Sequence, residues 1–430
     1  MKVLLIGGGG REHAIAAAIV KSRRVDKLYC APGNAGIAKI AECVPIGVME
    51  FDRLIDFAKE KQIDLAVCSQ DDPLCAGIVD AFEAAGLKIF GTRKNAAIIE
   101  GSKAFSKQLM KKYGIPTAAY EIFTDADRAV EYLRSCDYPI VLKADGLALG
   151  KGVLICKDFD QAQDGVREIM LDKKFGSAGN ELVIEEFMTG REVSALAFVD
   201  GTHYRLMSSS QDHKRIGDGD TGLNTGGMGT FSPSPFFTEE IRKACDRTIF
   251  QPTVDAMAKE GRPFRGVLYF GLMLTPQGPK VVEYNTRFGD PETQVVLPRM
   301  KTDIIDVFEA CMNGTLDKIS LAFEDNAAVC VVLASGGYPL HYEKGKVIAG
   351  LENFDGKPDL YCFHAGTKFD DEGRVVTNGG RVLGITALAP TLKEARAKAY
   401  EAVRLVSFEG MYMRHDIGKA IDDAQQCDVI

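Results

Sequence analysis

The chain has 430 residues, 46% hydrophobic and 26% charged, and its 52 basic against 60 acidic side chains give a formal net charge of −8. This composition is typical of a folded protein of about three domains and excludes disordered and fibrous classes. An acidic chain also lacks the charge pattern of a general nucleic-acid binder. Since no window reaches the roughly 18 apolar residues of a membrane helix, we expect neither nucleic-acid nor membrane partners.

Cysteine usage indicates the compartment. The 11 cysteines are odd in number, scattered along the chain, and never spaced C-x-x-C. Buried reduced thiols in a cytoplasmic protein are therefore favoured over disulfides or a zinc site.

The first hundred residues alternate short apolar runs with amphipathic stretches. This alternation predicts a parallel sheet with crossover helices. Strands are expected at 2–6, 27–30, 65–68 and 88–90, and helices at 12–21, 51–60 and 74–85. A glycine run at 7–10 falls between the first strand and the first helix, where backbone N–H groups commonly meet an anion.

The opening glycine run does not match a nicotinamide dinucleotide motif. Counted from Gly7, the pattern G-x-G-x-x-G places Glu12 where the third glycine belongs, and no acid follows the second strand in 31–36. A dehydrogenase is therefore disfavoured. Two glycine-rich turns at one edge of a parallel sheet favour a phosphate or ribose site over purely structural turns.

A second α/β section follows a helix that Ser102 is expected to cap. It contains predicted strands at 140–143, 153–156 and 182–185 and a helix from about 160. The loop 145–152 fails the Walker A pattern, because only three residues separate Gly146 from Gly150 and strands flank it on both sides. With Lys143 ending an apolar strand, a lid over nucleotide phosphates is favoured over a structural hairpin.

The segment 212–235 is rich in Gly, Asp, Ser and Thr and is predicted to lack regular structure. Such a segment in a compact protein is usually functional or mobile. Its alternating charges are compatible with a solvated loop or with a substrate loop in which Lys214 and Arg215 hold an anion. Later elements are expected as strands at 267–274, 280–285, 328–333 and 382–387 and helices at 304–312 and 392–406.

The strand 280–285 carries the clearest chemistry. Residues i and i+2 of a strand share a face, so Glu283 and Asn285 offer two oxygen ligands suited to Mg²⁺. Arg287 continues that face and is able to fork onto a carboxylate or phosphate. The alternative is the exposed face of an edge strand, which the apolar run at 267–274 disfavours.

Together these motifs resemble the phosphoribosylamine–glycine ligase (glycinamide ribonucleotide synthetase) family of the ATP-grasp superfamily. The matching segments are GGGGREH at 7–13, PGNAG at 32–36, EGSKAFSK at 100–107, YPIVLKADGLALGKGV at 138–153, QDHKRIGDGDTG at 211–222, NTGGMG at 224–229, EYNTRFGDPETQ at 283–294 and NGGRVLG at 378–384. They run in family order over essentially the whole chain.

The resemblance implies an α/β and α+β multidomain fold. Its parts would be an N-terminal parallel α/β domain over 1–101, an ATP-grasp domain of two subdomains over 102–325 with a lid at about 122–190, and a small C-terminal α+β domain over 326–430. It also implies ATP-dependent ligation of glycine to 5-phosphoribosylamine through a glycyl phosphate in purine biosynthesis. Mg²⁺ or Mn²⁺, small-molecule substrates, and a cytoplasmic monomer or weak homodimer complete the expectation.

The same resemblance assigns site residues. It places ATP at Lys103, Lys143, Gly150, Lys151, Gly152, Glu185, Phe187 and Glu192, and the metal at Glu283 and Asn285. Substrates would meet Gly9, Gly10, Asn34, Asp212, Gly227 and Arg287, with Arg287 on the glycine carboxylate. Catalytic roles would fall to Arg287, Asp212 and Lys214.

One departure and two further alternatives accompany this reading. Residues 69–72 read Ser-Gln-Asp-Asp where the family commonly has Gly-Pro-Glu, so Asp71 or Asp72 would have to replace that glutamate. A related ATP-grasp carboxylase or transformylase would share the nucleotide half of the site. A regulatory module would bind ATP without releasing phosphate.

Overall fold

The computed structural model describes residues 1–147 and 152–427. Within these ranges no helix combines the length and apolar character needed to cross a membrane. The cysteines from Cys30 to Cys362 are free thiols.

The N-terminal region is a parallel sheet with crossover helices, as predicted. Its strands are ordered β3-β2-β1-β4-β5. Their bounds are β1 (Lys2–Gly7), β2 (Lys27–Pro32), β3 (Glu42–Cys43), β4 (Leu65–Cys68) and β5 (Ile89–Phe90), with helices α1 (Gly10–Ile19), α2 (Phe51–Lys61), α3 (Asp71–Ala76), α4 (Ile78–Ala84) and α5 (Lys94–Gly101). The single helix expected at 74–85 is wrong, because Gly77 adopts a φ of 102° and separates α3 from α4.

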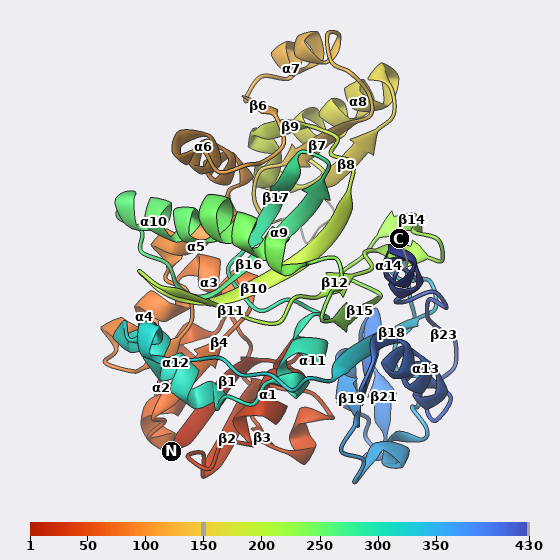
Figure 1. Ribbon diagram of the computed structural model, residues 1–430. Helices are drawn as coiled ribbons and strands as arrows, with labels where there is room; N and C mark the ends of the chain where they lie inside the picture. The colour runs from red at the N-terminus through yellow and green to blue at the C-terminus, as the bar shows by residue number, and fades with distance from the viewer. Residues whose placement is uncertain (148–151, 428–430) are drawn as a thin grey trace.

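Two antiparallel sheets form the middle of the chain. The lid sheet, ordered β6-β9-β7-β8, lies at the top of Figure 1 with α7 and α8, and the central sheet is ordered β11-β10-β16-β17. The lid elements are β6 (Tyr120–Phe123), α7 (Ala126–Leu133), β7 (Ile140–Ala144), β8 (Val153–Cys156), α8 (Phe159–Val166) and β9 (Leu182–Glu186). The central elements are α6 (Lys103–Tyr113), β10 (Arg191–Asp200), β11 (Tyr204–Leu206), α9 (Glu239–Cys245), α10 (Gln251–Lys259), β16 (Arg265–Thr275), β17 (Gly278–Asn285), α11 (Thr293–Val296) and α12 (Ile304–Asn313).

The C-terminal sheet contains strands from two distant parts of the chain. Its order is β12-β15-β18-β22-β19, with β23 also paired to β18. The bounds are β12 (Gln211–Asp212), β15 (Gly229–Ser232), β18 (Ala327–Ser335), β19 (Leu360–His364), β22 (Arg381–Ala389) and β23 (Met411–Tyr412), covered by α13 (Leu392–Val403). Outside it lie the hairpins β13 (Arg215–Gly217) with β14 (Thr221–Asn224) and β20 (Thr367–Phe369) with β21 (Val375–Thr377), and α14 (Ile421–Cys427).

The prediction that 212–235 lacks regular structure is therefore wrong. Four short strands, β12 to β15, occupy half of this segment. Strands of two to four residues leave too little alternation for a pattern to reveal them, and one of them, β15, pairs with the distant strand β18.

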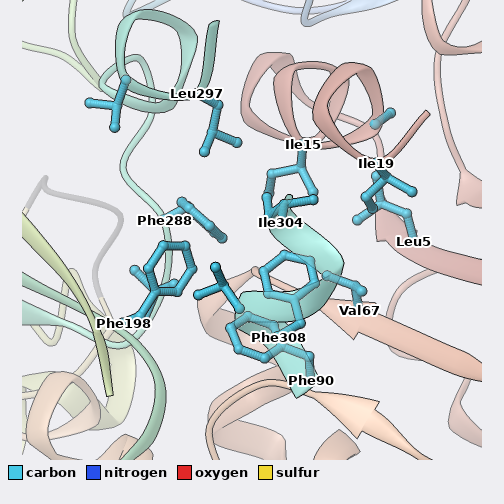
Figure 2. Packing of buried hydrophobic residues seen from close by; sticks show 14 of the residues in the cluster. Leu5, Ile15, Ile19, Val67, Phe90, Phe198, Phe288, Leu297, Ile304 and Phe308 are labelled. Carbon is cyan, nitrogen blue, oxygen red and sulfur yellow. The ribbon is translucent and has the colours of Figure 1, made fainter. Parts of the chain in front are cut away.

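One apolar core joins the N-terminal sheet to the central sheet. Phe90 from β5 stacks on Phe308 of α12 with ring centroids 4.0 Å apart, and Phe198 of β10 meets Phe308 edge-on. Figure 2 shows these rings packed with Leu5 and Val67 of the N-terminal sheet. Because the core is continuous, the glycine turn after β1 is held in a fixed position relative to β17.

The N-terminal region is also fixed to the C-terminal sheet by polar contacts. The Asn34 amide nitrogen donates to Gly8 O at 2.9 Å and to His364 O at 2.8 Å. The backbone N–H of His364 donates to His13 Nδ1 at 2.8 Å. Burial, reinforced by the neighbouring His364 and Lys39, lowers the pKa of His13 to about 3, and burial followed by Lys39 lowers the pKa of His364 to about 4.

This histidine pair predicts acid sensitivity. Both rings stay neutral in the folded protein but bind protons below about pH 6.5 once unfolded, so the unfolding free energy should fall as pH drops from 6.5 toward 4. The slope is up to about 1.4 kcal/mol per pH unit for each histidine. Urea unfolding of wild type and His364→Gln across this window measures it.

The exposed His341→Asn variant is the matched control and should keep the wild-type slope. An identical slope in His364→Gln and wild type would contradict the assignment.

Candidate active site

A carboxylate surrounded by cationic side chains lies where the lid sheet meets the central sheet. Glu283, on β17 opposite Gly271 of β16, is flanked by the cations Lys214, Lys143, Lys103 and Arg287. Lys214 is the largest contributor and, with the other cations, outweighs burial and lowers the pKa of Glu283 to about 2. Glu283 is therefore ionised at neutral pH, and the cations around it outnumber it.

Lys214, between β12 and β13, bridges two carboxylates. Its Nζ lies 3.2 Å from Glu192 Oε2 and 3.5 Å from Glu283 Oε1. Burial would lower its pKa, but Glu192 and Glu283 reverse that effect and raise it well above the ordinary value. Lys214 is thus a permanent cation beside the predicted metal ligands, and its position depends on the loop that carries it.

Two buried lysines share Glu185 on β9. Lys107 Nζ lies 3.0 Å from Glu185 Oε2 and donates to Thr117 Oγ1 at 2.7 Å, while Lys143 Nζ lies 3.0 Å from Glu185 Oε1. The Lys143 approach does not satisfy hydrogen-bond geometry at Oε1, so we regard it as a charge contact. Burial is the main cause that lowers the pKa of Lys107 to about 8, against the opposing effect of Glu185.

The start of α6 is joined to the lid loop. Asp145 accepts from Ala104 N at 2.9 Å and from Ser102 Oγ at 3.1 Å, and Lys103 Nζ donates to Gly146 O at 2.7 Å. Burial lowers the pKa of Lys103, which keeps a poorly solvated amine facing the site. Of the other predicted loop residues, Gly152 follows directly on the undescribed segment, and Gly150 and Lys151 lie outside the described residues.

The end of β17 carries the predicted metal and carboxylate-binding residues. Glu283 and Asn285 oppose Gly271 and Tyr269, two residues apart on β16, and so share a face. Arg287 Nη2 donates to Asn285 Oδ1 at 3.4 Å, and its Nε, 3.6 Å from Glu100 Oε1, has no hydrogen-bond partner among the described residues. β17 is in fact an edge strand, contrary to expectation, yet this face meets the cations instead of solvent.

A second group of contacts joins the three regions of the chain. Arg381 on β22 lies 2.9 Å from Asp290 Oδ2 and donates to Gly226 O at 2.6 Å. A Cβ at Gly227 would lie 2.6 Å from Asp212 Oδ1, and one at Gly9 would lie 2.8 Å from Glu12 Oε2. The glycines thus let the two backbones approach these carboxylates closely.

The remaining predicted residues have mixed placements. Gly10 is the first, buried residue of α1 and lies near Asp290. Asn34 lies at the same junction, but its side chain is committed to Gly8, His364 and the N–H groups of residues 36 and 37. Phe187 is 39% exposed at the end of β9. Burial, followed by nearby Glu292, raises the pKa of Asp212 well above its ordinary value.

Sequence reasoning missed several residues that the structure brings to the site. They are Glu100, Lys107, Asp290 and Arg381. All four fall inside the segments that carry the family resemblance, and Lys107 follows Lys103 by one helical turn, so the signal was present. Their partners are distant in sequence, and only the fold shows which polar residue of each segment points inward.

Lid and central sheets that meet at lysines and at a carboxylate–asparagine strand end define an ATP-grasp protein. The biotin carboxylase domain of Hydrogenobacter thermophilus 2-oxoglutarate carboxylase has this fold, with a TM-score of 0.74 at 17% identity over 100% of this chain and 94% of that one. Family models described as phosphoribosylglycinamide synthetase N domain, ATP-grasp (A) domain and C domain match residues 1–100, 101–293 and 328–420. The chain belongs to the phosphoribosylglycinamide synthetase family.

Individual relatives agree over the full length. The phosphoribosylamine–glycine ligase of Caldanaerobacter subterraneus subsp. tengcongensis is 49% identical over 97% of this chain and 99% of the relative. That of Salmonella typhimurium is 48% identical over 99% of this chain and all of the relative. The crystal structure of the Thermotoga maritima phosphoribosylamine–glycine ligase superposes with a TM-score of 0.83 at 35% identity, covering 97% of this chain and 100% of that one.

Removing Lys107 tests the buried charge cluster. In Lys107→Met, Glu185 keeps only Lys143, so we expect a loss of about 3–5 kcal/mol of unfolding free energy, the usual result of breaking a buried ion pair. Lys112→Met removes an exposed lysine from the same helix, paired to Glu260, and should leave stability unchanged. Equal stabilities of the two variants in chemical denaturation would contradict a structural charge cluster.

Proposed function

We propose that the chain joins glycine to 5-phosphoribosylamine at the expense of ATP, giving glycinamide ribonucleotide, ADP and phosphate. The observation that carries this proposal is the cluster of Lys103, Lys143, Lys214 and Arg287 around Glu283. Such a cluster suits a reaction whose substrates bring phosphates and a carboxylate into one place. The names of the full-length relatives support the same substrates.

ATP is assigned to the junction of the two sheets. Lys103 and Lys143 would meet its phosphates, and Gly150, Lys151 and Gly152 of the lid loop are proposed for the same role. The hinge after β9, with Glu185, Phe187 and Glu192, is assigned to adenine and ribose. Because the Glu185 carboxylate is paired to two lysines, its contribution is to position Lys143, and the strand backbone would meet the base.

Glu283 and Asn285 fit a divalent cation that also binds substrate oxygens. The described residues contain no group of three His, Cys, Asp or Glu side chains that could hold a metal alone. Two side-chain oxygens on one strand face match Mg²⁺, which takes few protein ligands and several from phosphates. Mg²⁺ or Mn²⁺ bound there would neutralise phosphate charge during transfer.

Glycine and the ribosylamine are assigned to the side of the site that faces the N-terminal region. Arg287, with its buried Nε available, would hold the glycine carboxylate. Gly9, Gly10, Asn34, Asp212 and Gly227 would line the ribosylamine pocket. Asn34 acts there by fixing the backbone of its turn, since its side chain is fully used.

The reaction then needs positioning and charge neutralisation instead of a protein nucleophile. The glycine carboxylate attacks the γ-phosphate of ATP, ADP leaves, and glycyl phosphate forms. The ribosylamine nitrogen attacks the glycyl carbonyl carbon, phosphate departs, and the proton that the nitrogen loses leaves with the phosphate. Arg287 orients the carboxylate, Lys214 offsets the charge that gathers beside Glu283, and Asp212 accepts a hydrogen bond from the attacking amine.

We further assign the three regions to 1–101, 102–325 with a lid at about 122–190, and 326–430. The separate N-terminal, lid and central sheets support these divisions. We expect a cytoplasmic protein that acts as a monomer or weak homodimer on small molecules.

Phosphate release tests the function. With ATP and Mg²⁺, we expect rapid release only when both glycine and freshly prepared phosphoribosylamine are present. Release that depends on bicarbonate or formate would indicate a related ATP-grasp enzyme. Binding of ATP without release for any substrate pair would indicate a regulatory protein.

Glu283→Ala should abolish ATP turnover while the fold remains intact. The change removes the carboxylate to which Lys214 and the proposed metal are bound. Initial rates over a Mg²⁺ titration, with circular dichroism for folding, measure this. Glu239→Gln, on the exposed start of α9, is the matched control, and wild-type activity of Glu283→Ala at ordinary Mg²⁺ would refute the metal assignment.

Arg287→Ala should raise the KM for glycine far more than the KM for ATP. Loss of a charged hydrogen bond to a carboxylate costs about 1.5–3 kcal/mol, or roughly 10- to 150-fold in KM. Arg287→Lys keeps the positive charge but loses the two-pronged guanidinium geometry. Its KM for glycine should therefore fall between those of wild type and Arg287→Ala. An equal rise in both KM values would argue against carboxylate recognition.

A further inference from the structure

The β13–β14 hairpin contributes little to any core of its own. Strand β14 is mostly exposed, and β13 and β14 form a sheet of two strands only. A two-stranded hairpin of this size is marginal in water without outside support. Lys214 lies directly before β13, so whatever holds the hairpin also decides where this lysine points.

The support comes from residues 412–418, at the far end of the chain. We call this segment the C-terminal clasp; Figure 1 shows the neighbourhood of β14 and β23. Arg414 is its centre, with a side chain 1% exposed. Its Nε donates to Asp416 Oδ1 and its Nη2 donates to Asp416 Oδ2, each at 2.8 Å. Its Nη1 donates to Asp220 Oδ1 at 2.8 Å and to Arg215 O at 3.1 Å.

Three further hydrogen bonds join the clasp to the hairpin. Its backbone N–H at His415 donates to Asp218 Oδ1 at 2.7 Å, and Asp416 Oδ2 accepts from Gly219 N at 2.7 Å. The Tyr412 hydroxyl donates to Ile216 O at 2.8 Å. The two aspartates of the hairpin turn, Asp218 and Asp220, are thus both engaged with the clasp.

The backbone on both sides of Lys214 is held by the same segment. His213, before it, accepts from Gly418 N through Nε2 at 3.1 Å and contacts Gly229 O through Nδ1 at 3.0 Å. Arg215, after it, gives its carbonyl to Arg414. Lys214 therefore lies between two residues that the clasp holds in place. From that position its side chain reaches Glu192 and Glu283.

We propose that Arg414 is a positioning residue of the ligase site: from the C-terminal clasp it fixes the β13–β14 hairpin so that Lys214 stays between Glu192 and Glu283. Arginine is suited to this role because its planar fork binds one carboxylate at two points and still donates to further acceptors. Lysine at the same place keeps the charge and loses this geometry. The kinetic part of the proposal rests on the proposed function, whereas the structural part does not.

Hydrogen exchange of the full-length protein tests the structural part. In Arg414→Lys, amides of residues 213–224 should exchange at least about tenfold faster than in wild type, while those of α13 stay protected. Asp220→Asn removes the negative charge of one partner in the exposed turn, keeps an acceptor oxygen, and keeps a residue that tolerates the left-handed φ of 54°; it should show a smaller change in the same direction. Unchanged exchange at 213–224 in both variants would overturn the proposal.

Kinetic coupling tests the positioning role. Arg414→Lys should lower kcat/KM by about ten- to hundredfold, as a small misplacement of a site residue does. In a Lys214→Met background the same change should add no further loss, because Arg414 acts through Lys214. Val403→Ala, in the apolar core on the buried side of α13, destabilises the same region without removing any of the polar contacts to the hairpin and should keep wild-type kinetics.

Full additivity of the Arg414 and Lys214 changes, or wild-type kinetics of Arg414→Lys despite faster exchange, would overturn the proposal. A wild-type protein that fails to ligate its substrates would refute the proposed function alone, since the exchange experiment needs no substrate.

Discussion

One carboxylate balances the cations of the site before its substrates arrive. Anionic substrates require several cations close together, and cations gathered without a counterion repel one another and destabilise the fold. Glu283 supplies the counterion: Lys214, Lys143, Lys103 and Arg287 all act on it, and its pKa falls to about 2. Glu185 is likewise the buried counterion of Lys107 and Lys143. The net charge of −8 is a sum over the whole chain, so it does not reveal the local excess of cations around Glu283.

All regions of the chain contribute to the position of these charged side chains. The N-terminal sheet contributes its glycine turn through a core shared with α12, as the stacked rings of Phe90 and Phe308 illustrate. The lid sheet supplies Lys143 and the central sheet supplies Glu283. The C-terminal region adds no cation to the cluster around Glu283, but it holds the loop that carries Lys214 through Arg414 and meets Asp290 through Arg381. Each region therefore contributes either a charge or the frame that fixes one.

Local patterns were sufficient for much of this arrangement. The alternation of elements predicted the parallel N-terminal sheet, and period-two spacing placed Glu283 and Asn285 on one face of β17. What failed depended on distant partners. Of the short strands in 212–235, β15 pairs with the distant β18, and β17 is an edge strand whose polar face is covered by lysines from other elements. No local spacing reveals that the Asn34 amide donates a hydrogen bond to His364, 330 residues away.

The mixed origin of the C-terminal sheet limits how the chain can be divided. Every residue of β18 is buried, and residues 328–331 pair with β15 from the preceding region. A fragment that starts near residue 326 would leave that stretch of apolar strand with unused backbone donors and acceptors, the usual template for self-association. Recombination between homologous genes at this point would join mismatched halves of one sheet. The C-terminal region is thus a unit of sequence comparison without being a unit of folding.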